Sequence, residues 1–102
     1  MATKTATWNG KVIAEADQDD LVFIEGGWYF PAESVNKEYL EDSDLTTECF
    51  WKGTANYYNL VDGDTKGANL AWYYAHPKDG SEDKVGKKFA NFVSFYPQVT
   101  VA

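Results

Sequence analysis

The sequence predicts a mainly β fold of compact antiparallel sheets with one short helix. Runs of β-branched and aromatic residues recur along the chain, and Asn, Asp and Gly residues typical of tight turns separate them. Helical spacing of apolar residues occurs in one short segment. With 102 residues the chain can bury one core but not two, so we expect a single domain over residues 1–102.

The N-terminal third predicts a hairpin followed by two strands. Short β-prone runs in residues 4–16 flank Asn9-Gly10, the dipeptide that best tolerates the positive φ angles of a type I′ turn. The apolar run 21–24 has the length of a strand, and residues 28–30 resume the sheet after two glycines.

Residues 31–41 are the segment expected to be helical. Pro31 suits the first turn of a helix, and apolar side chains recur at helical spacing up to Leu40. The polar residues 41–44 then predict a break in regular structure.

A second hairpin and a closing strand region complete the predicted order of elements. Residues 52–61 and 68–75 flank the turn-rich segment 62–67. Residues 76–84 have the composition of a loop, and residues 89–101 predict one or two closing strands.

Composition argues against several kinds of partner. Nine Lys and no Arg stand against sixteen Asp and Glu, which gives an acidic chain with a formal net charge of −7 at pH 7. This balance repels nucleic acids and anionic membrane surfaces, so neither is an expected partner. The first twenty residues contain no long apolar run, so we expect neither a signal peptide nor a membrane-spanning helix.

Cys49 is the single cysteine, and this count limits its chemistry. It cannot form an internal disulfide, and a chain with one cysteine and one histidine cannot assemble the usual four-ligand thiolate zinc site, so we expect no bound metal. A free thiol is typical of a reducing compartment, which favours a cytoplasmic location.

The candidate site centres on residues 46–53, where Glu48, Cys49 and Lys52 lie close to Trp51 in the chain. A nearby ammonium favours a thiolate, so Cys49 could be a nucleophile or a redox group, although a free cysteine is commonly just a small buried hydrophobic residue. Lys52 could extend along a strand towards water, or it could pair with an anionic ligand.

Aromatic residues near this segment supply the walls of a predicted cleft. Alternation along a strand places Trp72 and Tyr74 on one face, where cross-strand pairing brings them near Tyr57 or its neighbour. Such rings either fill a core or line a pocket. His76 ends this strand and could act as a general base towards Cys49, which is the sharpest enzyme hypothesis.

Four segments together carry a family resemblance: residues 8–14, 28–31, 46–55 and 71–74. In this order they resemble the bacterial family of domains of unknown function numbered 427, and the resemblance covers nearly the whole chain. It implies a compact antiparallel fold related to the β-tent proteins, such as methionine sulfoxide reductase B, with a cleft between packed sheets. The resemblance implies no settled activity.

Two properties of relatives do not carry over to these residues. The β-tent relatives commonly hold zinc in two Cys-x-x-Cys knuckles, which this sequence lacks. The family also bears a nucleotidyltransferase label, but that chemistry needs paired metal-binding carboxylates after a Gly-Ser turn. Here residues 91–94, which lie nine or more positions after Gly80-Ser81, contain no acid. Phe50 and His76 also stand where the family pattern often has proline and an acidic residue.

We therefore expect a cytoplasmic domain that binds a small molecule in an aromatic-lined cleft. One alternative is an enzyme that uses Cys49 as nucleophile or redox thiol, aided by His76. Another is a module for self-association or protein interaction through exposed sheet edges and aromatic patches. The predicted ligand-binding residues are Tyr29, Glu48, Cys49, Trp51, Lys52, Tyr57, Trp72 and Tyr74.

Overall fold

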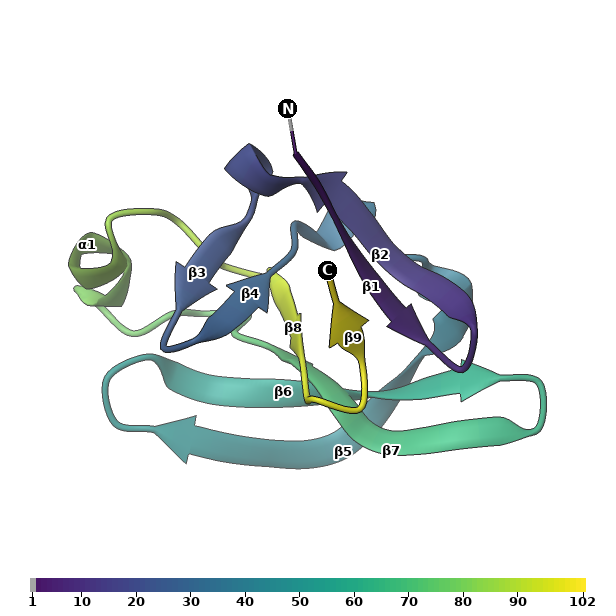
Figure 1. The fold of residues 1–102 in the computed structure, drawn as a ribbon. Helices are drawn as coiled ribbons and strands as arrows, with labels where there is room; N and C mark the ends of the chain where they lie inside the picture. The colour runs from purple at the N-terminus through teal and green to yellow at the C-terminus, as the bar shows by residue number, and fades with distance from the viewer. Residues whose placement is uncertain (1) are drawn as a thin grey trace.

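A computed structural model describes residues 2–102 and arranges them in three antiparallel sheets (Figure 1). The first sheet has the order β2-β1-β9, the second pairs β3 with β4, and the third has the order β5-β6-β7-β8. The first two sheets lean over one face of the third (Figure 1). The strands are β1 (Thr3–Trp8), β2 (Lys11–Asp17), β3 (Val22–Ile24), β4 (Gly27–Tyr29), β5 (Leu40–Cys49), β6 (Gly53–Asp62), β7 (Thr65–Tyr73), β8 (Val93–Phe95) and β9 (Thr100–Val101).

The predicted N-terminal hairpin is confirmed. β1 pairs with β2, and Asn9 and Gly10 turn between them with φ angles of 53° and 74°. The two following strands are also present, because β3 pairs with β4 through a turn at Glu25 and Gly26. Both turns have two positive φ values in succession, as the right-handed twist of a hairpin favours.

The helix predicted over residues 31–41 is wrong. Two short 3₁₀ turns occupy residues 32–34 and 37–39, and β5 begins at Leu40. Long-range pairing overrides the local spacing, because the Asn36 amide donates to the Ile13 carbonyl at 2.7 Å and Leu40 pairs with Leu60 across the sheet.

The predicted break at residues 41–44 is also wrong, since these residues belong to β5. β5 is an edge strand of the third sheet, so its polar side chains remain in water. The register with β6 shifts between Asp42 and Thr46, which shows that the polar residues interrupt the ladder without ending the strand. The α-helix is α1 (Ser81–Val85), which begins inside the segment 76–84 that we expected to be a loop and ends one residue beyond it.

The second hairpin is confirmed with a tighter turn than expected. β6 and β7 pair from Asn56 opposite Tyr73 to Asp62 opposite Thr65, so two residues form the turn. β8 adds to β7, and an isolated bridge between Phe30 and Val93 joins the end of β4 to the same sheet. This bridge holds the β3–β4 hairpin over the third sheet.

Two buried clusters form the core, and they differ in composition. The first lies largely between the first and third sheets and is mainly aliphatic, with Ile13, Leu60 and Val99 among its members. The second lies under the β3–β4 hairpin and is rich in aromatic rings, with Tyr29, Tyr74 and Phe89 at its centre. Within residues 2–102, no helix has the length and apolar character needed to cross a membrane.

Candidate functional site

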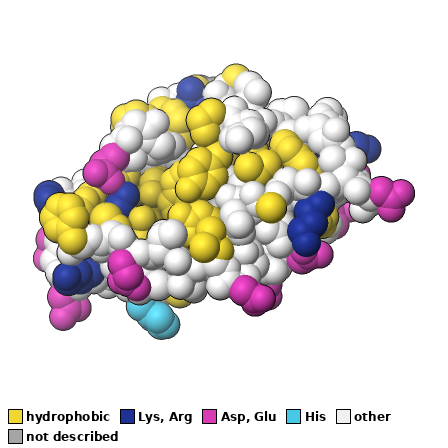
Figure 2. All heavy atoms as spheres, turned by 90° about the horizontal axis from the view of Figure 1, so that it is seen from below, with side chains coloured by type: hydrophobic (Ala, Val, Ile, Leu, Met, Phe, Trp, Pro, Cys, Tyr) yellow, Lys and Arg dark blue, Asp and Glu magenta, His cyan; other side chains and the backbone are white. Residues whose placement is uncertain are grey.

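A cleft of about 300 Å³ opens beside the aromatic cluster, between the β3–β4 turn and the segment that follows β8. Seen from below, the molecule shows hydrophobic side chains gathered around a hollow, with basic and acidic side chains near its margin (Figure 2). The cleft is lined by Ile24, Glu25, Gly26, Gly27, Tyr29, Lys52, Trp72, Phe95, Tyr96 and Pro97.

Lys52 reaches this cleft from the β5–β6 turn, and the turn is fixed by the chain that follows β7. The Lys78 amide donates to the Lys52 carbonyl at 2.8 Å, and the Lys78 ammonium donates to the Phe50 carbonyl at 2.9 Å. Gly53 has a φ of 112°, and a Cβ there would lie 3.3 Å from the Lys78 nitrogen. This close approach of two backbones, together with the positive φ, favours glycine at this position.

The Lys52 ammonium is buried and paired with Glu25. Its Nζ lies 2.5 Å from the Glu25 carboxylate, and it stands 5.4 Å above the ring centres of both Trp51 and Tyr74. Burial alone would lower the lysine pKa, but the hydrogen bond to Glu25 and the nearby Tyr29 and Tyr74 oxygens outweigh burial and raise that pKa. Lys52 is therefore a fixed cation rather than a neutral, nucleophilic amine.

The two members of this pair differ sharply in exposure. The Lys52 side chain is 9% exposed, whereas the Glu25 side chain is 58% exposed on the rim of the cleft. The hydrogen bond from Lys52 lowers the pKa of Glu25, so its carboxylate stays ionised at neutral pH. A buried cation thus depends on a partner that remains in contact with water.

Glu25 also adopts an unfavourable backbone conformation. Its φ is 50°, and the other non-glycine residues of the described chain with positive φ are Asn9, Asn69 and Asn91. Asparagine tolerates this conformation, whereas other side chains lose roughly 1–2 kcal/mol. A glutamate in this position is an outlier of the kind that clusters at functional sites.

Tyr29 and Trp72 form the floor of the cleft. The Trp72 Nε1–H donates to the Tyr29 hydroxyl at 3.1 Å, and the two rings meet edge to face. Burial raises the pKa of Tyr29, so the phenol is protonated at neutral pH. Because the Tyr29 oxygen acts as the acceptor in its bond with Trp72, its own O–H can still donate to another group.

Tyr96 forms an outer wall that the sequence did not indicate. Its ring lies 4.8 Å from the Trp72 ring and stacks on Tyr57 with an angle of 15° between the planes. Tyr57 and Trp72 are direct cross-strand partners, as alternation along the strands predicted. Tyr96 follows a short strand and precedes Pro97, and this local sequence gives no sign that its ring contacts the rings of β6 and β7.

The structure brings some predicted site residues together. Tyr29, Lys52 and Trp72 line the cleft, and Tyr57 and Tyr74 are buried behind them. Burial and the nearby Tyr29 raise the pKa of Tyr74 to about 12.

The remaining predicted residues lie outside the cleft. Trp51 lies on another side of Lys52, where the Lys84 ammonium stands 4.6 Å above its ring. Glu48 is exposed and accepts a hydrogen bond from Thr54 at 2.6 Å. Cys49 is half-buried against the aromatic cluster.

The proposed pairing of Cys49 with His76 is not formed in the described residues. No hydrogen bond joins the two side chains there, and His76 is exposed at the surface. A nucleophile and its base must lie within hydrogen-bond reach, so this geometry does not supply the dyad. Residues 2–102 likewise contain no group of three or more His, Cys, Asp or Glu side chains that could hold a metal ion.

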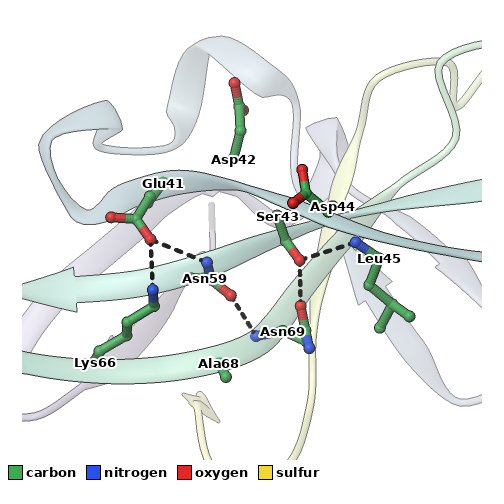
Figure 3. Close-up of a pocket in the computed structure, with 9 residues that line it drawn as sticks. All are labelled: Glu41, Asp42, Ser43, Asp44, Leu45, Asn59, Lys66, Ala68 and Asn69. Carbon is green, nitrogen blue, oxygen red and sulfur yellow. Dashed lines mark hydrogen bonds and ion pairs between the residues drawn. The ribbon is translucent and has the colours of Figure 1, made fainter.

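A second, wider hollow of about 650 Å³ lies over the irregular part of β5 (Figure 3). Its polar groups bond to one another. The Asn59 amide donates to Glu41 at 3.0 Å and accepts from the Asn69 backbone at 2.9 Å, and Lys66 pairs with Glu41 at 2.8 Å. Asp42 points away from this bonded group (Figure 3). These contacts link β5, β6 and β7 where their registers shift, so the polar groups that line the hollow serve the sheet itself.

Comparison with known families confirms the resemblance seen in the sequence motifs. The family model described as "Domain of unknown function (DUF427)" matches residues 3–102. No curated protein matches the sequence.

Proposed function

We propose that this chain, which belongs to the DUF427 family, binds a small molecule that carries an acidic group beside a flat apolar part. The site is the cleft around Lys52, and the acidic group of the ligand pairs with the Lys52 ammonium. One observation carries the proposal: a buried cation lines an aromatic cleft while its carboxylate partner, Glu25, sits exposed on the rim.

Charge burial explains why such a cation favours an anionic ligand. Removing the partner of a buried charge is strongly unfavourable, so the Lys52 ammonium needs an anion at all times. The Glu25 carboxylate is well solvated, so exchanging it for a ligand carboxylate costs little desolvation on the protein side. Lys52 therefore stays in place, while the anion that pairs with it can change from Glu25 to the ligand.

The remaining groups of the cleft complement such a ligand. The Tyr29 O–H can donate to a second oxygen of the ligand, since its own oxygen already accepts from Trp72. Trp72 and Tyr96 present ring surface that a flat apolar group can cover. A few convergent polar groups on an aromatic surface are typical of small-molecule sites.

Thermal-shift measurements against a library of small carboxylic acids test the proposal. A ligand at one hundred times its dissociation constant stabilises the protein by about 2.7 kcal/mol, which is readily detected. We expect Lys52→Met to abolish the shift while keeping most of the packing of the lysine stem. Lys66→Met is the matched control, because Lys66 also pairs with a glutamate but lies outside the cleft.

Two results would contradict the proposal. A ligand that stabilises Lys52→Met as strongly as the unmodified protein binds elsewhere. A library in which neutral compounds shift the melting temperature and acids do not would assign the cleft a different ligand class.

A further inference from the structure

We infer that the ligand of this cleft is a zwitterion with an amino group and a carboxylate a few atoms apart, such as an α-amino acid with an apolar or aromatic side chain. The inference rests on the proposed function and specifies its ligand class. The ligand inserts between Glu25 and Lys52, so that its carboxylate pairs with Lys52 and its ammonium pairs with Glu25.

The juxtaposition of two opposite charges at one end of the cleft favours a ligand with both charges. A ligand with only an acidic group satisfies Lys52 but places a second negative charge beside Glu25, in a chain whose net charge is already −7. A ligand with only an amino group satisfies Glu25 and leaves the buried Lys52 without an anion. A zwitterion satisfies both residues and adds no net charge.

The pair is built so that one member can move and the other cannot. Lys52 is held by its backbone bond to Lys78 and by the rings of Trp51 and Tyr74. Glu25 stands on a two-residue turn with its side chain largely in water. Rotation of the Glu25 side chain therefore opens the pair without disturbing the buried lysine.

The identity of residue 25 supports a role for its carboxylate beyond the turn. The turn geometry favours asparagine or glycine, and the chain uses asparagine at its other non-glycine positions of positive φ, within the described residues. A strained residue points to a function that its side chain serves. In this site the carboxylate faces the cleft that Lys52 also lines.

Size and wall chemistry limit the rest of the ligand. A volume of about 300 Å³ lies at the low end of the range for small-molecule sites, which favours a molecule of amino-acid size. Trp72, Phe95, Tyr96 and Pro97 line the cleft away from the ion pair and suit an apolar or aromatic side chain.

Three probes of matched size separate the charge requirements: L-phenylalanine, 3-phenylpropionate and phenethylamine. Binding is measured by isothermal titration calorimetry at neutral pH, where the amino and carboxyl groups are ionised. We expect L-phenylalanine to bind at least about tenfold more tightly than either analogue, because each analogue leaves one charged group of the site unsatisfied. In Glu25→Gln we expect this advantage over 3-phenylpropionate to be lost. Glu41→Gln, which removes the carboxylate of an exposed ion pair, serves as the control and should keep it.

The outcomes distinguish the inference from the proposed function. Equal affinity for 3-phenylpropionate and L-phenylalanine would overturn the zwitterion class while supporting an acid-binding cleft. An advantage of L-phenylalanine that persists in Glu25→Gln would overturn the role of Glu25. If the twenty common amino acids produce no thermal shift and a library acid does so through Lys52, the inference is wrong and the proposed function holds.

Discussion

Two lysine–glutamate pairs of similar length lie in very different surroundings. Lys52 and Glu25 are 2.5 Å apart, and Lys66 and Glu41 are 2.8 Å apart. The Lys52 side chain is 9% exposed and contacts aromatic rings, whereas the Lys66 side chain is 55% exposed on the open sheet (Figure 3). Burial of one partner, rather than the ion pair as such, makes Lys52 depend on a nearby anion, whereas water can solvate Lys66 without its partner.

The largest expected difference is in stability after removal of each lysine. Lys52→Ala removes a buried side chain whose ammonium lies over the rings of Trp51 and Tyr74, so we expect the free energy of unfolding to fall by about 2–3 kcal/mol. Lys66→Ala acts at the surface and should change it by less than about 0.5 kcal/mol. Urea unfolding followed by tryptophan fluorescence measures both. If both substitutions lower the free energy of unfolding equally, burial of Lys52 does not distinguish the two pairs in stability.

Both ion pairs contribute to the pH dependence of stability. Hydrogen bonds from Lys52 and Lys66 lower the pKa values of Glu25 and Glu41 below their ordinary value of 4.5. The unfolded state therefore takes up protons first as the pH falls. The stabilisation from each carboxylate is present above about pH 4.5 and is lost as the pH drops through the folded-state pKa.

Salt separates the two contributions. At about 0.5 M NaCl, screening weakens the pair between exposed groups much more than the pair with a buried member. Part of the stability lost below pH 4.5 depends on Glu25, and we expect this part to persist in salt. Another part depends on Glu41, and we expect it to become smaller in salt. Acid unfolding of Glu25→Gln and Glu41→Gln with and without salt measures each part. A contribution of Glu25 that vanishes in salt would show that burial of Lys52 does not protect the pair.

The smallest expected effect concerns Cys49, which lies near the buried pair and not near the exposed one. Glu25→Gln removes the carboxylate that holds Lys52. If Lys52 pairs with Glu25 and the ligand but does not activate the thiol, the rate of Cys49 alkylation by iodoacetamide should stay within about twofold of the rate in the unmodified protein. Mass spectrometry against time gives this rate. A large acceleration would couple Lys52 to the thiol and favour the enzyme hypothesis for Cys49.

The fold was predictable from sequence where short-range geometry decides it. Asn9 and Gly10 take the positive φ angles of a hairpin turn, so the hairpin was predicted correctly. The segment 31–41 was predicted incorrectly, because its apolar spacing fits a helix while its backbone is engaged by Ile13 and Leu60 from distant strands.

Three of the ten residues that line the cleft were predictable from the sequence. Tyr29, Lys52 and Trp72 were predicted from their chemistry and neighbours, and all three line the cleft. Glu25 and Tyr96 were missed, because a glutamate in a glycine-containing turn and a tyrosine before a proline resemble ordinary surface residues. Their roles follow from contacts with residues that are far away in the chain.

The β class, the turn at Asn9 and Gly10 and the family of this protein are predictable from the chain alone, because alternation, turn preference and motif order are properties of the linear sequence. Which lysine is buried, and which carboxylate pairs with it, depends on how the sheets pack together. Lys52 and Glu25 are 27 positions apart, and their contact exists because the bridge from Phe30 to Val93 places one hairpin turn over another. Burial and pairing are properties of packed surfaces, and no local pattern contains them.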